Sequence, residues 1–62
     1  MTVKQFIEHT IDKYDIAIYK GSKCVYWGYV RNVPEVLGDE HIALIKVFVH
    51  LSENFTIEVF LP

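Results

Sequence analysis

The sequence predicts a small α+β domain in which an N-terminal helix packs on a four-stranded, mostly antiparallel sheet. Two observations predict it. A helical repeat of apolar residues opens the chain, and every second residue is apolar in two later stretches. We expect two hairpins to form the sheet, with a short helical turn between the hairpins. Residues 1–62 form a single domain, because a chain of 62 residues is too short to build two.

The first predicted element is a helix over roughly residues 3–12. Thr2 precedes Gln5 by three positions, which is the spacing of a capping box at a helix start. We expect the Phe6, Ile7 and Ile11 stripe to lie on the sheet. The residues that follow the spacing of an amphipathic helix are Val3, Phe6, Ile7, Thr10, Ile11 and Tyr14.

The first predicted hairpin joins a strand over residues 15–20 to a return strand over about residues 24–30. Gly21 and Ser22 are a two-residue turn candidate, with glycine first as a type II′ turn prefers. Ile16 and Ile18 share one face of the first strand, because side chains alternate along a strand. Gly28 inside the return strand indicates a bulge, or the close approach of another side chain or backbone.

A short helical turn is predicted over residues 32–38, where Pro34 fits the first helical position and Gly38 the end. The second hairpin runs from about residue 42 to residue 61, with a loop at residues 52–54. Its alternating apolar residues fall on one side and form a core with Ile16, Ile18 and the helix. These residues are Ala43, Ile45, Val47, Val49, Leu51, Phe55, Ile57, Val59 and Leu61. The order of the strands across the sheet does not follow from these patterns.

The opposite face of the sheet is the predicted contact surface. Depending on register, the first hairpin adds Val25, Trp27 and Tyr29 to it, or Cys24 and Tyr26. The short turn or the chain terminus could cover part of this face. Hydrophobic residues make up 52% of the chain, however, and contiguous exposed apolar patches mark interfaces. We therefore predict a protein interface, with Lys46 and Glu58 as a cross-strand pair that sets orientation. Its residues are Leu44, Phe48, Phe60, Trp27, Tyr29, Lys46 and Glu58.

The chain lacks the usual supports of very small domains. A domain of this size buries only about 60% of the surface that its unfolded chain exposes. Cys24 is the only cysteine, so no internal disulfide forms, and no Cys/His pattern predicts structural zinc. The adjacent Asp39, Glu40 and His41 fan outward and favour a solvated loop over a metal site. We expect no metal and no cofactor, and we expect stabilisation by a partner subunit in a homo-oligomer.

Catalysis has little basis in the sequence. Cys24 has no evident base within reach, and we expect it to be a small apolar filler of its strand. The paired carboxylates, Glu8 with Asp12 and Asp39 with Glu40, have no evident pocket around them. We therefore predict that the protein is not an enzyme and has no small-molecule substrate. It acts through the apolar sheet face or through an exposed strand edge that accepts another chain.

Two alternatives to this protein-binding function remain open. One is a structural subunit of a homo-oligomer with no foreign partner. The other is a single-stranded nucleic-acid-binding protein, because aromatic residues on a sheet beside cations can stack bases. Six Lys and Arg residues against eight acidic ones argue against it, since attraction to phosphates needs clustered cations. Its residues would be Tyr19, Lys20, Lys23, Tyr26, Trp27, Tyr29 and Arg31.

The sequence favours the cytoplasm. Lys4 and Glu8 interrupt any early apolar run, so no signal peptide is evident. The longest apolar stretch, residues 42–51, covers about half of a membrane span and contains Lys46 and His50. A single unpaired cysteine suits the reducing cytosol. We expect no membrane association.

Three segments carry a resemblance to known proteins: VKQFIE at residues 3–8, YDIAIY at residues 14–19 and YWGYVRNVPEVL at residues 26–37. Together they resemble small uncharacterised proteins encoded in phages, prophages and conjugative elements of Gram-positive bacteria. The shared layout is a short helix, a strand ending near tyrosine, a hairpin return and a Pro-Glu turn. The final hairpin is longer and more apolar here. The resemblance implies a mobile-element accessory protein, an inhibitor or modulator that docks on a host or element-encoded protein, and it assigns no site residue.

Overall fold

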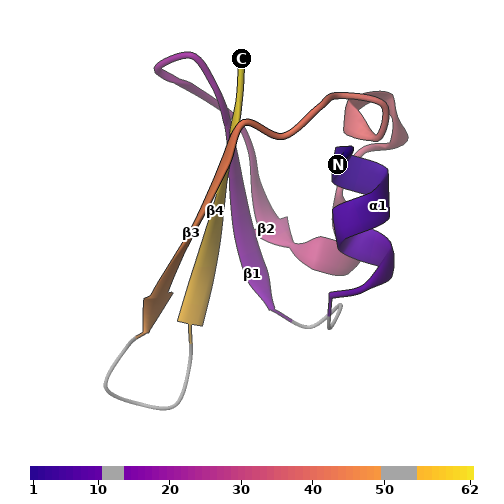
Figure 1. Ribbon diagram of the computed structural model, residues 1–62. Coiled ribbons are helices and arrows are strands. Elements are labelled where there is room, and N and C mark those ends of the chain that lie inside the picture. The colour runs from indigo at the N-terminus through magenta and orange to yellow at the C-terminus, as the bar shows by residue number, and fades with distance from the viewer. Residues whose placement is uncertain (11–13, 50–54) are drawn as a thin grey trace.

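The computed structural model describes residues 1–10, 14–49 and 55–62, and it has the predicted α+β class (Figure 1). None of the helices in these ranges is long and apolar enough to cross a membrane. The elements in chain order are helix α1 (Val3–Glu8), strands β1 (Asp15–Lys20) and β2 (Lys23–Tyr29), the 3₁₀ turns η1 (Val30–Asn32) and η2 (Glu35–Leu37), and strands β3 (Leu44–Val49) and β4 (Phe55–Leu61).

Helix α1 begins with the predicted capping box. The Gln5 N–H donates to the Thr2 hydroxyl (3.2 Å), and the Thr2 N–H donates to Gln5 Oε1 (2.9 Å). The N–H groups of Val3 and Lys4 donate to carbonyl oxygens of residues 40 and 38, at 2.9 and 3.0 Å. The free donors of the first turn are thereby satisfied. These bonds tie the helix to the segment that leads into β3.

Replacing Thr2 with alanine should lower the free energy of unfolding by about 1 kcal/mol, because the cap hydroxyl is lost. Urea denaturation followed by circular dichroism measures the change. Thr2→Ser keeps the hydroxyl and is the matched control. Equal midpoints for Thr2→Ala and the wild type would show that the cap contributes nothing.

The predicted extension of this helix to residue 12 is wrong, because α1 ends at Glu8. The Thr10 N–H donates to the Ile7 carbonyl (3.1 Å), an i→i−3 bond that tightens the last turn. The Thr10 hydroxyl donates to the Phe6 carbonyl (2.7 Å) and takes an acceptor that the helix would otherwise use. Phe6 and Ile7 pack against the core as predicted, and Ile11 lies outside the described residues.

The strand order across the sheet is β2-β1-β4-β3. Both predicted hairpins are present, since β1 pairs with β2 and β3 with β4 in antiparallel fashion. Between the hairpins, β1 and β4 pair in parallel, so the sheet is mixed. The predicted helical turn at residues 32–38 forms as η1 and η2 instead, with Pro34 as the N-cap of η2. These turns lie with α1 on one side of the sheet (Figure 1).

The core lies between the sheet and α1. Ile16 and Ile18 of β1 pair in register with Ile57 and Val59 of β4, and all four are buried. The buried residues of the core cluster are Val3, Ile16, Ile18, Val30, Ile57, Val59 and Leu61. The structure thus confirms the core positions predicted for Ile16, Ile18 and the end of β4.

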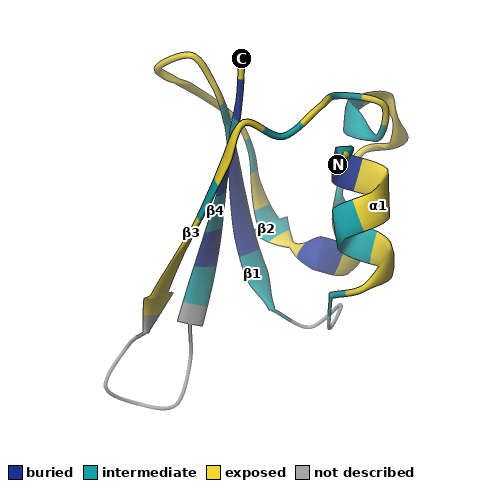
Figure 2. Ribbon diagram, viewed as in Figure 1, coloured by how far each residue is buried: buried dark blue, intermediate teal, exposed yellow. Residues whose placement is uncertain are grey.

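The prediction was wrong for the start and middle of the third strand, where Ala43 and Val47 are exposed. Val47 is 56% exposed although its register partner Ile57 is buried. The helix and the turns lie over β1 and β2 on one face of the sheet. The outer strand β3 is therefore mostly exposed (Figure 2). Leu51 lies outside the described residues.

Gly28 is a site of close approach, as its place inside β2 predicted. A Cβ atom there would lie 2.7 Å from Tyr26 Oη, and the φ of Gly28 is +155°. The Tyr26 hydroxyl donates to the Tyr29 carbonyl (2.7 Å). The bulge lies nearer the turn, where Ile18 pairs with Tyr26 and the next pair skips a residue of β2.

Candidate interaction surface

The side of the sheet away from α1 carries no helix or turn in the described part of the chain (Figures 1 and 2). We call this side the open face. Its members follow from the strand register, because directly paired residues point to the same side. They are Asp15, Ala17, Tyr19, Cys24, Trp27, Tyr29, Leu44, Lys46, Phe48, Thr56, Glu58 and Phe60. Every residue of the predicted protein interface is among them.

The register of β2 takes residues from both of the sets left open by the sequence, because Cys24 lies on the open face with Trp27 and Tyr29. Trp27 pairs with Ala17 and Tyr29 pairs with Asp15, so both aromatic residues lie on the open face. Tyr26 pairs with Ile18 and lies on the core side, where it packs partly buried against the core. Val25 is the residue skipped at the bulge.

The large side chains of the open face are well exposed to solvent. Trp27 is 70% exposed, Leu44 is 50% exposed, and Phe48 and Tyr29 are close to half exposed. Phe60 is less exposed, because its ring stacks on the ring of Tyr19, with centroids 5.2 Å apart and planes 13° apart. A stacked aromatic pair therefore lies near the C-terminal ends of the two central strands, with exposed apolar residues on both edge strands.

Lys46 and Glu58 are direct register partners, as the sequence predicted for an orienting pair. The ammonium of Lys46 lies 5.4 Å from the centroid of the Phe60 ring, within the range of a cation–π contact. Glu58 is flanked by Ala17 on its other side. Charged groups of both signs thus stand among the aromatic and aliphatic side chains of the open face.

Sequence reasoning left Ala17 and Tyr19 out of the predicted interface. Ala17 is only 3% exposed although no described element covers it, and its register partners on the two adjacent strands are the larger residues Trp27 and Glu58. Alternation placed Ala17 and Tyr19 opposite Ile16 and Ile18. What the sequence did not show was that β1 lies in the centre of the sheet.

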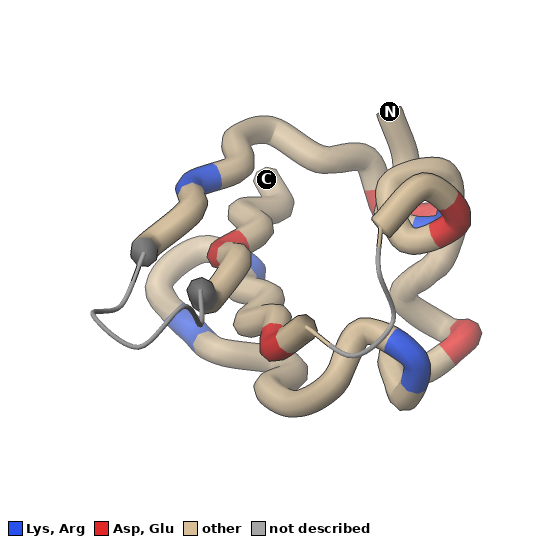
Figure 3. The backbone as a smooth tube through the Cα atoms, turned by 90° about the horizontal axis from the view of Figure 1, so that it is seen from below, with Lys and Arg blue, Asp and Glu red and all other residues tan. Residues whose placement is uncertain are grey.

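The structure divides the residues of the nucleic-acid alternative between the two faces. Tyr19, Trp27 and Tyr29 lie on the open face, and Tyr26 lies on the core side. Lys20 Nζ forms an ion pair with Glu40 (2.9 Å). Arg31 lies over the Tyr29 ring at 5.0 Å. Lys23 is exposed at the hairpin end. Charges of both signs are spread over the described chain without a continuous basic strip (Figure 3).

The remaining chemistry-bearing residues of the described ranges do not gather into a site. In the described ranges, no three His, Cys, Asp or Glu side chains come close enough to hold a metal ion. Cys24 is exposed at the end of β2, with its thiol 3.4 Å from the Tyr26 carbonyl. The expectation that it fills an apolar strand position was therefore wrong, because it lies beyond the bulge and on the open face.

No family model matches the chain, and no curated protein or solved structure matches it either. The resemblance to proteins of mobile elements therefore stays a prediction.

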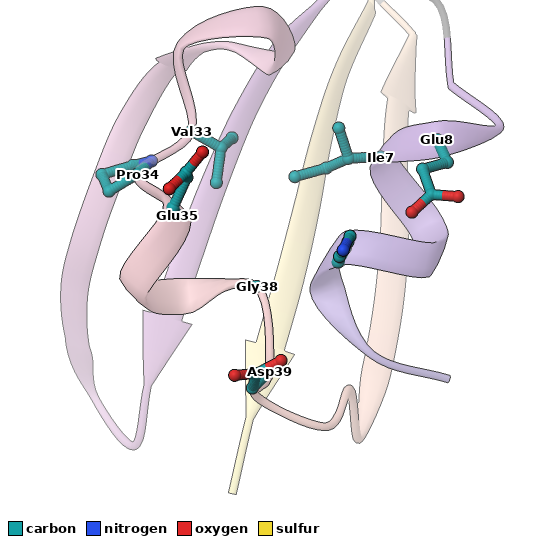
Figure 4. A pocket seen from close by; sticks show the side chains of 8 residues that line it. Ile7, Glu8, Val33, Pro34, Glu35, Gly38 and Asp39 are labelled. Atoms are coloured by element: carbon teal, nitrogen blue, oxygen red, sulfur yellow. The ribbon is translucent and has the colours of Figure 1, made fainter.

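A hollow of about 420 Å³ lies on the other side of the molecule, between α1 and η2. Ile7 and Val33 face each other across it, and the carboxylates of Glu8, Glu35 and Asp39 stand apart around its rim (Figure 4). These acidic side chains are exposed. Water therefore has access to them at the rim of the hollow.

Proposed function

We propose that this chain is a non-catalytic protein–protein interaction module that binds a partner protein through its open face. The observation that carries this function is the exposure of Trp27, Leu44 and Phe48 on one uncovered face. These residues lie on the two edge strands, and the Tyr19–Phe60 aromatic pair lies in the central strands between those edges. Large apolar side chains gathered on one exposed face are typical of interaction sites. Trp and Tyr are also enriched at the centres of protein interfaces, because they bury much area with few rotatable bonds.

The charges of the open face indicate the chemistry of the partner. Asp15 and Glu58 lie in the central strands, and Lys46 is engaged with the Phe60 ring. A complementary surface would be flat and apolar and would carry a basic group able to meet these carboxylates. Ion pairing of Lys20 with Glu40 leaves the hairpin end less able to attract phosphates. These features favour a protein partner over a nucleic acid.

The role that suits such a module is that of a mobile-element accessory protein, an inhibitor or modulator, as the resemblance implies. We place it in the cytoplasm, where the exposed thiol of Cys24 would stay reduced.

A capture experiment with matched variants tests this function. The double variant Trp27→Ser, Phe48→Ser should lose the bound protein, because truncating interface aromatics costs about 2 kcal/mol or more each, roughly thirtyfold in affinity. Val36→Ser is the matched control, since Val36 is 83% exposed but lies in η2, away from the open face. Proteins from the native host that bind the wild type and the control are identified by mass spectrometry.

Circular dichroism should show that both variants stay folded, because the replaced side chains are at least half exposed or close to it. Binding that survives the double variant, or that is lost equally in Val36→Ser, would overturn the assignment of the open face. Loss of the fold in the double variant would show that these residues belong to the core.

A further inference from the structure

We propose that β3 pairs with β3 of a second copy in antiparallel fashion, so that the open faces of two molecules join into one continuous surface. This inference goes beyond the proposed function, because it follows from the edge of β3 alone, and the paired strands would extend the same face that binds the partner protein. In this proposal, the chain that occupies the edge of β3 is a second molecule of the same protein.

The two edges of the sheet differ in their readiness to pair. Strand β2 carries a bulge near Val25 and a glycine with φ of +155°, and such irregularities disfavour strand addition. Strand β3 pairs with β4 from Leu44 to Val49 without a shift of register. Its outer side has no strand partner in the described residues. The regular edge is therefore the one available to a second chain.

The side chains of β3 also lack the usual protection of an edge. Natural edge strands commonly carry inward-pointing charges or proline. The inward-pointing position in the middle of β3, where such a charge would stand, is occupied by Val47. Val47 lies on the core side and is 56% exposed because α1 does not reach it. Lys46 is the only charged residue of β3, and its ammonium lies over the Phe60 ring on the open face.

Symmetry and charge select one register. A two-fold axis perpendicular to the sheet keeps both open faces on the same side and centres the strand pair on one residue. Centring on Lys46 would set two ammonium groups opposite each other, which is destabilising. Centring on Val47 sets Val47 against Val47 of the second copy, and it sets Lys46 opposite Phe48 of the second copy. Each Lys46 then lies between Glu58 of its own chain and an aromatic ring of the other.

The N-terminal segment excludes a register centred nearer the start of β3. Thr2 forms a bridge with His41, and the Ile42 N–H donates to the Met1 carbonyl (2.9 Å). A pairing centred on Ile45 would run the incoming strand into this segment. A pairing centred on Val47 ends before it. The resulting ladder is short, so we expect a dimer that dissociates on dilution.

Cysteine cross-linking tests the register. Val47→Cys and Leu44→Cys are each made in a Cys24→Ser background, and their native positions are similarly exposed, at 56% and 50%. Directly opposed residues have Cα atoms about 4.5–5.5 Å apart, within the range of a disulfide. In the proposed register the two Leu44 positions lie about 20 Å apart along the strands. Mild oxidation should therefore produce a covalent dimer of Val47→Cys and little of Leu44→Cys.

Sedimentation across a dilution series tests the dimer without cysteine chemistry. Val47→Lys sets like charges opposite each other and should weaken the dimer roughly tenfold or more. Trp27 lies on the far strand β2, so Trp27→Ser should leave the affinity of the dimer unchanged. A wild type that is monomeric at every concentration, a dimer that Val47→Lys leaves intact, or preferential cross-linking of Leu44→Cys would each overturn the pairing.

The two proposals fail in different ways. A dimer cross-linked through Val47→Cys that captures no foreign protein would leave the pairing standing and remove the proposed function. A monomer that still captures a protein through Trp27 and Phe48 would do the reverse.

Discussion

Replacing Ile18 with alanine should lower the free energy of unfolding by about 4 kcal/mol. Ile18 is fully buried in β1, one of the two central strands, with Tyr26 and Val59 as its register partners on either side. Strand pairing on both sides holds these neighbours in place. The cavity left by the missing side chain therefore cannot collapse easily, which places the cost toward the upper end of the usual range.

The effect is large relative to the whole stability of the domain. Small proteins have about 0.05–0.15 kcal/mol of stability per residue, which gives about 3–9 kcal/mol for a chain of 62 residues. The variant should therefore lose a large part of the stability of the domain, measured by urea denaturation and thermal melting. Val36→Ala, at an 83% exposed position, should change stability by less than about 0.5 kcal/mol. A loss below 1 kcal/mol for Ile18→Ala would contradict close packing between the sheet and α1.

Local features of the chain were predictable because they depend on neighbouring residues. The capping box needs only Thr2 and Gln5, and both of its hydrogen bonds are present. Alternation along the last strand predicted the buried face that contains Ile57 and Val59. The early end of α1 was missed because a helical repeat does not reveal that the Thr10 hydroxyl will bond to the backbone.

The arrangement of the strands was not predictable from these patterns. The parallel pairing of β1 with β4 joins residues about forty positions apart, and no periodicity encodes it. Alternation also assigns a side chain to a face without saying whether anything covers that face. Val47 was therefore predicted to be buried and is exposed, since the short helix covers the opposite half of the sheet.

The bulge in β2 decides which aromatic residues lie on the open face. A two-residue turn at Gly21 and Ser22 with no bulge would set Trp27 opposite Ile16, on the core side. The skipped residue in β2 shifts the pairing, so that Trp27 lies opposite Ala17 on the open face and Tyr26 faces the core. The sequence could name both sets of aromatic residues, but only the bulge decides between them.

Gly28→Ala is the substitution that tests this stretch of β2, and it should cost about 3 kcal/mol. The φ of +155° is unfavourable for a residue with a Cβ, which accounts for about 1–2 kcal/mol. The new methyl group would also lie 2.7 Å from Tyr26 Oη and 3.2 Å from its Cζ, so the ring must move. Gly21→Ala separates the two contributions, because Gly21 has φ of +63° but nothing within 4 Å of a Cβ. It should cost only about 1 kcal/mol.

A double-mutant cycle with Tyr26→Phe measures how much of this cost comes from the Tyr26 hydroxyl. Tyr26→Phe alone should cost about 1 kcal/mol, because the hydrogen bond to the Tyr29 carbonyl is lost. Removing Oη also removes the closest contact of the new methyl group. Gly28→Ala should therefore cost about 1 kcal/mol less in the Tyr26→Phe background than in the wild type. Equal costs in both backgrounds, measured by urea denaturation, would show that the Tyr26 hydroxyl contributes nothing to the penalty. The backbone conformation and the ring atoms that phenylalanine retains, with Cζ 3.2 Å from the new methyl group, would then account for the need for glycine at this point of the strand that presents Trp27.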